Sequence, residues 1–353
     1  MAQTTETSTG LRPETIRIVN LIYTQMCNLQ PDTNVLVIAD SRTPTWVVRA
    51  FMGGAMALGA RAMVAENATP PPPSVQPSIA WNSMVVAAAK EADLIVDLAV
   101  GYARFIDDAL DRGARVITPG DGTGGHHIEE SLIRTLLAAD VHALRREADE
   151  LADAFTQAST GHITSEEGTD IVIDLDSIEG EANDGFLWDP DKGAWKSSWA
   201  IVPPAQPGVL LPKGRGNGVI AVDGFLLYEP AYDHETPTGP VFVTIEDGKI
   251  VDISGHPLFA GRLRHWLDAQ PDDSASFGPV HINLGTNPRA MLTQHLEFER
   301  IRGTIVFGFG DSSMSMMLGP GFEPVRSHVH WDLLIMRPTM TLDGRVIVEN
   351  GIM

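Results

Sequence analysis

The sequence has very little cysteine. Cys27 is the only cysteine among 353 residues, so no disulfide can form within the chain. A zinc or iron–sulfur site built from several thiolates of this chain is excluded for the same reason. If the chain binds a metal, the ligands must therefore be His, Asp or Glu.

Basic residues are also scarce, and the chain is strongly acidic. Lys and Arg number 25 against 46 Asp and Glu, which gives a net charge of −21. Such a chain repels phosphate backbones and anionic lipid headgroups, so we expect neither nucleic acid nor a membrane among its partners. No apolar run reaches the about 18 residues of a membrane span, and the first ten residues do not resemble a signal peptide. We predict a cytoplasmic protein.

Several common cofactor and catalytic motifs are missing. Residues 40–45 (DSRTPT) follow the first predicted strand where a dinucleotide-binding protein would have GxGxxG, so NAD binding is disfavoured. The GxSxG nucleophile elbow, the HExxH zinc motif and the GK[ST] phosphate loop are absent too. Hydrophobic residues make up 43% of the chain, which is enough for a folded core.

Apolar strands alternate with amphipathic helices along the first half of the chain. Strand 34–39 (NVLVIA) is apolar throughout, as in a parallel sheet that is covered on both faces. The alternation predicts a Rossmann-like α/β domain over 13–160, preceded by a disordered segment, 1–12. The predicted strands are 34–39, 60–64, 93–98 and 114–118, and the predicted helices are 13–30, 46–58, 81–92, 105–112, 128–138 and 141–157.

After residue 160 the pattern changes to short strands and tight turns, which predicts an α+β domain over 161–353. Asp247-Gly248 and Asp343-Gly344 have the composition of hairpin turns. The predicted strands are 170–175, 218–222, 241–245 and 249–253, and the predicted helices are 260–269 and 289–299.

The densest polar cluster is 327–332 (SHVHWD), which precedes an apolar run. Side chains alternate between the two faces of a strand, so His328, His330 and Asp332 are predicted to point the same way. Two imidazoles and a carboxylate are costly to bury unless they bind a metal or each other. This cluster is the strongest metal signal in the chain, and the alternative is an exposed face of an edge strand.

His281 is the second candidate ligand. It lies at a predicted strand before a Gly-Thr-Asn-Pro turn, and sites in α/β proteins are usually built at strand ends. A lone histidine is, however, more often a core or surface residue.

Three glycine-containing segments are candidate pocket walls. Residues 118–127 (TPGDGTGGHH) would be a loop closing over the site, or a plain connection with a helix cap. Residues 213–218 (KGRGNG) would be an anion clamp or a hairpin, and 310–314 (GDSSM) could line a pocket. In so acidic a chain, Arg215 and Arg289 are candidate cations for holding an anionic substrate.

The second half of the chain resembles a known metalloenzyme scaffold. The segments that carry the resemblance are 285–292 (GTNPRAML) after His281, 305–310 (IVFGFG) and 328–351 (HVHWDLLIMRPTMTLDGRVIVENG). The scaffold is shared by the aminopeptidase T-type metallopeptidases and by 2,5-dihydroxypyridine 5,6-dioxygenase. The resemblance is weak over most of the chain and specific from residue 278 onward.

The dioxygenase branch implies one Fe(II) per chain, held by His281, His330 and Asp332. Two histidines and one carboxylate on one side of iron leave positions open for substrate and O₂. The implied activity is extradiol-type cleavage of a hydroxylated N-heteroaromatic ring such as a dihydroxypyridine. The implied fold is a Rossmann-like N-terminal domain plus an α+β C-terminal metal-binding domain.

The peptidase branch is the alternative, and it implies a dinuclear metal centre and hydrolysis. Its His-x-Asp pair resembles His330 and Asp332. One Glu ligand of the peptidases falls on His281, and their other His ligand falls on Val306. A further Glu ligand belongs at 205–208, where this chain has no carboxylate. The resemblance therefore favours mononuclear iron, and a non-enzymatic relative is the third hypothesis.

Further roles are assigned as expectations. Two pocket histidines of the dioxygenases fall near Ala103 and Ser198, so His126 or His127 is a candidate substitute. A metal-bound imidazole needs a hydrogen-bond partner, which His328 could supply. The partners expected are an aromatic substrate, O₂ and further copies of the chain. We name as catalytic candidates His328, Ser313 and His127, and as substrate-binding candidates Arg289, Ser312 and Arg215.

Overall fold

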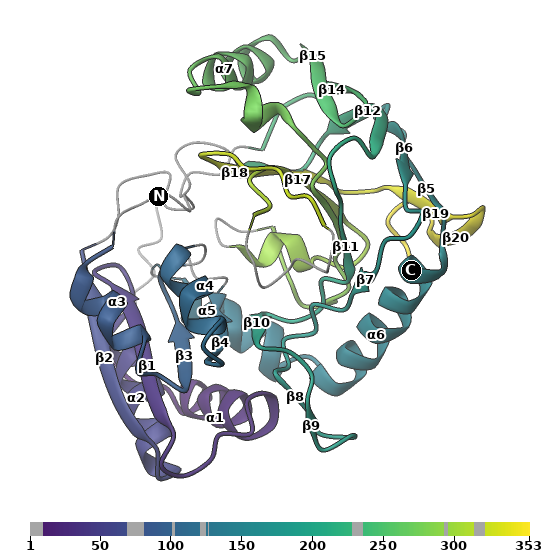
Figure 1. Cartoon of the computed structure of the whole chain (residues 1–353). Helices are drawn as coiled ribbons and strands as arrows, with labels where there is room; N and C mark the ends of the chain where they lie inside the picture. The colour runs from purple at the N-terminus through teal and green to yellow at the C-terminus, as the bar shows by residue number, and fades with distance from the viewer. Residues whose placement is uncertain are drawn as a thin grey trace, which may run out of the picture.

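A five-stranded parallel sheet forms the N-terminal part of the protein (Figure 1). The strand order is β10-β4-β3-β1-β2. These strands are β1 (Asn34–Asp40), β2 (Arg61–Asn67), β3 (Leu94–Asp97), β4 (Arg115–Pro119) and β10 (Trp199–Val202). This computed structural model describes residues 10–68, 81–100, 103–120, 125, 127–227, 236–292, 296–313 and 322–353.

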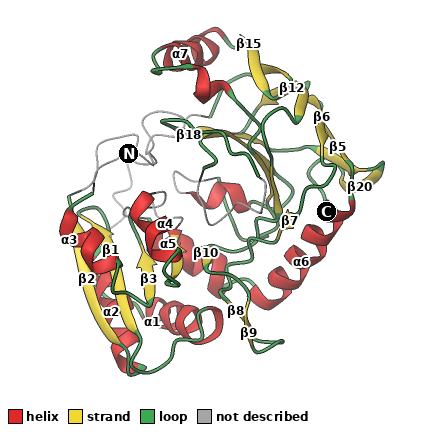
Figure 2. Cartoon of the chain, in the orientation of Figure 1, coloured by secondary structure: helices red, strands yellow, loops and turns green. Residues whose placement is uncertain are grey.

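Helices cover both faces of this sheet (Figure 2). Val35 and Val37 of β1 pack with the first two helices, whereas Leu36 and Ile38 pack with the next two. The predicted parallel sheet is therefore confirmed. No helix in the described ranges is long and apolar enough to span a membrane. The helices are α1 (Pro13–Leu21), α2 (Thr45–Ala57), α3 (Ser83–Ala89), α4 (Arg104–Leu110), α5 (Ile128–Leu132) and α6 (Val141–Gln157), with π-helical turns η1 (Ile22–Met26) after α1 and η3 (Ile133–Leu137) after α5.

Two features of this half differ from the predicted pattern. The predicted helix 13–30 ends at Met26, because Asn28 takes a left-handed backbone conformation with φ 45°. The edge strand β10 comes from beyond residue 160 and pairs with β4. The division of the chain at residue 160 stays a prediction, and only 10–12 of the predicted disordered segment 1–12 are among the described residues.

Two larger antiparallel sheets form the C-terminal part and share one apolar core. The predicted turns are confirmed, since Asp247, Gly248, Asp343 and Gly344 all have positive φ. One sheet has the order β15-β14-β12-β6-β5-β19-β20, from β5 (Thr160–Thr164), β6 (Asp170–Asp174), β12 (Gly216–Val222), β14 (Val241–Glu246), β15 (Lys249–Gly255), β19 (Thr339–Leu342) and β20 (Arg345–Val348). The other has the order β13-β18-β17-β16-β11-β7, from β7 (Gly180–Glu181), β11 (Gly208–Leu210), β13 (Leu226–Leu227), β16 (His281–Leu284), β17 (Ile305–Gly310) and β18 (His330–Ile335).

The predicted helix 289–299 is confirmed only as a 3₁₀ turn over 296–299, whereas 289–292 are not helical. The helices after β15 are α7 (Pro257–Asp268) and two 3₁₀ turns, η4 (Asp273–Ser276) and η5 (Leu296–Arg300). Asn287 explains the difference, because its side chain accepts the backbone N–H of Arg289 and its backbone N–H bonds to the carbonyl of Arg300. These bonds favour a turn where apolar spacing alone suggests a helix.

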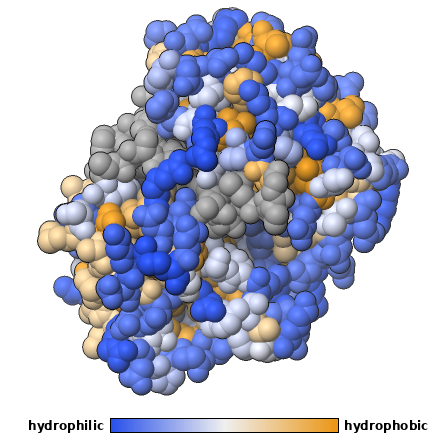
Figure 3. Space-filling view, in the orientation of Figure 1, coloured by the Kyte–Doolittle hydropathy of each residue, from blue (hydrophilic) through white to orange (hydrophobic). Residues whose placement is uncertain are grey.

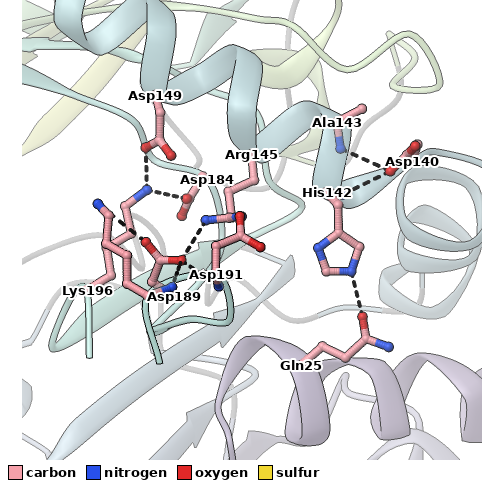
Figure 4. A network of polar contacts seen from close by, with 11 residues as sticks. Gln25, Asp140, His142, Ala143, Arg145, Asp149, Asp184, Asp189, Asp191 and Lys196 are labelled. Carbon is pink, nitrogen blue, oxygen red and sulfur yellow. Dashed lines mark hydrogen bonds and ion pairs between the residues drawn. The ribbon is translucent and has the colours of Figure 1, made fainter. Parts of the chain in front are cut away.

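A network of ion pairs joins α6 to the hairpin of β8 (Trp188–Asp189) and β9 (Ala194–Trp195) (Figure 4). Arg145 is 3% exposed and pairs with the buried Asp189 at 3.0 Å and with Asp191. Lys196 pairs with Asp149 and with the buried Asp184. Because this hairpin leads directly into β10, the network links α6 to the edge of the parallel sheet.

We predict that Arg145→Met lowers the free energy of unfolding by about 3–5 kcal/mol, because it removes the buried cation of Asp189 and leaves only the solvent-exposed Lys192 beside this carboxylate. Urea denaturation measures the change. Lys192→Met is the matched control, because Lys192 pairs with the same Asp189 from a side chain that is 81% exposed. It should cost less than about 1 kcal/mol. Equal losses in the two variants would contradict this interpretation of the network.

Candidate metal centre

Three neighbouring strands bring His281, His330 and Asp332 together. His281 is the first residue of β16, and His330 and Asp332 are the first and third residues of β18. Strand β17 lies between them, and its Gly308 is opposite both His281 and Asp332. Directly opposed residues of antiparallel strands point to the same face, so all three side chains share one face of the sheet.

Gly308 lets the His281 ring cross the middle strand. A Cβ atom at position 308 would lie 2.0 Å from His281 Nε2 and 2.1 Å from its Cδ2. The ring therefore occupies the space above Gly308, and its Nε2 lies 3.1 Å from Asp332 Oδ1 and 3.2 Å from His330 Nε2. The distance from His330 Nε2 to Asp332 Oδ1 is 3.5 Å.

The loop after β17 orients the His330 ring. His330 Nδ1 lies 2.8 Å from the carbonyl oxygen of Asp311, to which it donates, so Nε2 faces the other two residues. The Asp311 carboxylate is buried and accepts hydrogen bonds from the Ser313 N–H, the Ser313 hydroxyl and the Ser327 N–H. Asp311 thus holds both the loop and, through its backbone, the histidine.

The three side chains fit a divalent cation. Their ligand atoms lie within 4.8 Å of one another, and within the described ranges they are the only such group of three. Asp332 Oδ1 is buried and accepts no hydrogen bond from a described residue, although both Nε2 atoms lie within 3.5 Å of it. A cation between the nitrogens and the carboxylate would satisfy this oxygen. Two imidazoles and one carboxylate suit iron and similar transition metals.

The pKa values of His330 and Asp332 also support a cation site. Burial alone would lower the pKa of His330, but the Asp332 carboxylate and the Asp311 carbonyl outweigh it and raise the pKa to about 9. Burial opposes ionisation of Asp332 too, yet the two histidines hold its pKa well below the usual range. Asp332 therefore carries a buried negative charge, which the proton on His330 balances. A bound metal would replace that proton.

The two predicted pocket serines lie beside this centre. Ser312 and Ser313 are buried in the loop that follows β17. The Ser312 hydroxyl accepts the Val325 N–H, and the Ser313 hydroxyl donates to Asp311. Ser313 also accepts a hydrogen bond from Arg104 Nη2 at 3.4 Å. Arg104 is the first residue of α4, so the N-terminal half reaches the site through this arginine.

The other predicted site residues that the structure describes form no hydrogen bond or ion pair with the three ligands. His328 precedes β18 and is exposed, and His127 is an exposed residue before α5, 4.0 Å from Glu130. Arg215 pairs with Asp174 at 2.6 Å, and Arg289 donates to the Ala138 carbonyl at the end of η3. Their roles in catalysis and binding stay predictions. His126, the alternative to His127, lies outside the described residues.

Sequence reasoning missed Gly308, Asp311 and Arg104. The alternate glycines of β17 (IVFGFG) were the available signal for the first, because a strand that lacks side chains on one face can admit a neighbour's ring. No local pattern marks Asp311, which acts through its backbone carbonyl. Arg104 reaches the site only through the packing of the two halves.

A comparison with protein-family models decides the relationship. The model of NicX, 2,5-dihydroxypyridine 5,6-dioxygenase, matches residues 20–353. The chain belongs to the NicX family. A search of curated proteins gives no significant match.

Solved structures agree with the NicX relationship at the level of the fold. The 2,5-dihydroxypyridine dioxygenase from Pseudomonas putida KT2440 superposes with a TM-score of 0.77 at 18% identity, with 96% of each chain covered. AmpT from Thermus thermophilus superposes with a TM-score of 0.64 at 16% identity, covering 95% of this chain and 99% of AmpT. The resemblance of this NicX-family chain to both branches of the scaffold is thus confirmed.

We predict that Gly308→Ala weakens metal binding at least tenfold, because the added methyl group occupies the place of the His281 ring. Titration of the purified protein with Fe(II) or Co(II) measures the affinity. Gly261→Ala in α7 is the matched control, since a Cβ there meets no atom within 4 Å. Unchanged affinity in Gly308→Ala with an intact fold would show that His281 is not a ligand.

Proposed function

We propose that the protein is a mononuclear Fe(II)-dependent dioxygenase that opens the ring of a hydroxylated N-heteroaromatic such as a dihydroxypyridine. The observation that carries the proposal is the group of His281, His330 and Asp332 on one face of the sheet. Membership of the NicX family supports the reaction class. When bound, ferrous iron supplies a Lewis acid for substrate oxygens and electrons for O₂.

The protein's own residues would hold and orient the reactants. His281, His330 and Asp332 would hold the metal from one face of the sheet, and three protein ligands would leave it coordination positions for the substrate and O₂. Gly308 adds no side chain to this face of β17, so the His281 ring can lie over the strand and reach the other two ligands. Asp311 fixes the ring of His330, so the ligand geometry is preorganised before substrate arrives.

Cationic and hydroxyl groups beside the ligands suit an electron-rich ring that has lost a hydroxyl proton. Arg104 and Ser313 contact each other at the edge of the site, and within the described ranges Arg104 forms no ion pair with a carboxylate. Because the chain carries a net charge of −21, a local cation is needed to favour an anionic substrate. We assign Arg104 to substrate binding.

His330→Ala and Asp332→Asn test the metal assignment. We expect one Fe per wild-type chain, and at least a tenfold loss of bound iron in each variant, by elemental analysis. His265→Ala in α7 is the control, because His265 is an exposed histidine on a helix that supplies none of the three ligands. Two metals per chain that survive both variants, with release of amino acids from peptides, would replace the proposal by a hydrolase.

The reaction is tested with 2,5-dihydroxypyridine and ¹⁸O₂. We expect consumption of one O₂ per substrate and both labelled atoms in the product. Loss of the labelled oxygen into water, or no O₂ uptake by the iron-loaded protein with any dihydroxypyridine, would contradict the proposal.

Arg104→Gln should raise KM for the hydroxylated ring about tenfold, a loss of about 1.4 kcal/mol, while kcat changes less. Steady-state O₂ uptake separates the two constants. Arg112→Gln is the control, because Arg112 is an exposed arginine just beyond the other end of α4. Equal KM values for the two variants would remove Arg104 from the binding site.

A further inference from the structure

The Asp311 carboxylate, in the turn after β17, is a buried anion. Asp311 is 6% exposed. Its Oδ1 accepts the Ser313 N–H at 3.0 Å and the Ser313 hydroxyl at 2.9 Å, and its Oδ2 accepts the Ser327 N–H at 2.9 Å. All of these partners are donors, so the group is ionised, because a protonated carboxyl would need an acceptor for its own hydrogen. Within the described ranges it forms no ion pair with Lys, Arg or His.

Three other buried carboxylates have a basic partner, which sets Asp311 apart from them. The pairs are Glu297 with Arg134, Glu299 with Arg300 and Asp189 with Arg145. At the surface, where Figure 3 shows mostly hydrophilic residues, water screens the charge of acidic side chains. A buried charge has no such screening and is costly without a counter-charge. The hydrogen bonds to Asp311 reduce this cost, but none of their donors carries a full positive charge.

The backbone on both sides of Asp311 is tied to the strand that carries His330. The carbonyl of Asp311 accepts from His330 Nδ1 at 2.8 Å, and its N–H donates to the Val329 carbonyl at 2.8 Å. The preceding residue, Gly310, has φ 81°, and a Cβ atom there would lie 2.2 Å from the Val329 oxygen. Ser327, which donates to the carboxylate, is three residues before His330. The Asp311 carboxylate therefore has a fixed place beside the imidazole.

A divalent metal at the three ligands would leave one positive charge unbalanced without Asp311. The metal brings two positive charges, histidine ligands are neutral, and Asp332 supplies one negative charge. Asp311 supplies the second negative charge and occupies no coordination position. Arg104 contacts the Ser313 hydroxyl at 3.4 Å and forms no ion pair with Asp311, so its charge stays available for an anionic substrate.

We propose that Asp311 is the second anion of the metal centre, which balances the charge of a divalent metal without binding it. This role rests on the proposed function, since it requires a metal at the three ligands. A fixed negative charge stabilises Fe(III) more than Fe(II), because the attraction grows with the charge of the ion. Asp311 therefore lowers the reduction potential of the iron, which then gives an electron to O₂ more readily.

Asp311→Asn tests this role, because the amide has the shape of the carboxylate and no charge. We expect Fe(II) to bind at least tenfold more weakly than in the wild type, and Fe(III) to lose at least a further tenfold. The further tenfold corresponds to a rise in the midpoint potential of about 59 mV for one electron. Titration of the purified protein with Fe(II) under argon measures the affinity, and a redox titration of the iron-loaded protein measures the potential.

Ser327→Ala is the matched control for the geometry of the turn. The Ser327 hydroxyl accepts the Val329 N–H and the Ser274 hydroxyl, so its removal loosens the same turn and leaves the charge of Asp311 in place. The midpoint potential of this variant should equal that of the wild type. Circular dichroism verifies the fold of each variant. If Asp311→Asn does not fold, Asp311→Glu and Asp311→Gln form a second pair of equal length, in which the uncharged variant should have the higher potential.

Three outcomes would overturn the role of Asp311. A wild-type chain that binds no iron overturns it together with the proposed function. Iron bound by Asp311→Asn with the affinity and the potential of the wild type overturns the role of Asp311 alone. An equal rise in potential in Asp311→Asn and Ser327→Ala does so too, because the effect would then come from the turn and not from the charge.

Discussion

The passage of the His281 ring over Gly308 is the contact on which the candidate metal centre depends. Neighbouring strands lie roughly 4.8 Å apart, so β16 and β18 are separated by about twice that distance. An imidazole from one can reach a carboxylate on the other only if it lies flat over the strand between them. Any side chain at position 308 would occupy that space, which makes the glycine as necessary to the site as the ligands themselves.

The opposite face of the same strands supports this arrangement. Phe307 and Phe309 alternate with the glycines of β17 and are fully buried, and Phe309 stacks on Trp331 with ring centroids 4.9 Å apart. Trp331 lies between His330 and Asp332 in sequence, and its Nε1 donates to the Ala275 carbonyl. Aromatic packing on one face therefore sets the backbone from which the ligands project on the other. A shift of β18 by one residue would turn the ligands toward the aromatic face and place Trp331 on the face of the site.

The sequence predicted those parts of the molecule that depend on local pattern. The apolar run of β1 identified a strand buried on both faces, and strand alternation placed His330 and Asp332 on one side. It could not predict that Trp199–Val202 returns to the first sheet, because that pairing joins segments about eighty residues apart. The helix expected at 289–299 does not begin at Arg289 for a related reason, since the hydrogen bonds of Asn287 outweigh helical spacing and only 296–299 form a 3₁₀ turn. His281 was a weak candidate from its place at a strand end, and the family resemblance made it a ligand, whereas its contact with Gly308 follows only from strand register.

The position of the N-terminal half relative to the ligands is set by buried polar contacts. Glu297 is fully buried and pairs with Arg134 and Ser131 of the α5–η3 segment, and the Asn287 amide donates to the Thr135 carbonyl. A buried carboxylate tolerates few arrangements, because any shift that removes its cation leaves a charge without compensation. Apolar surfaces alone would permit sliding at lower cost. The polar contacts therefore fix the angle between the halves, and with it the approach of Arg104 to the loop that orients His330.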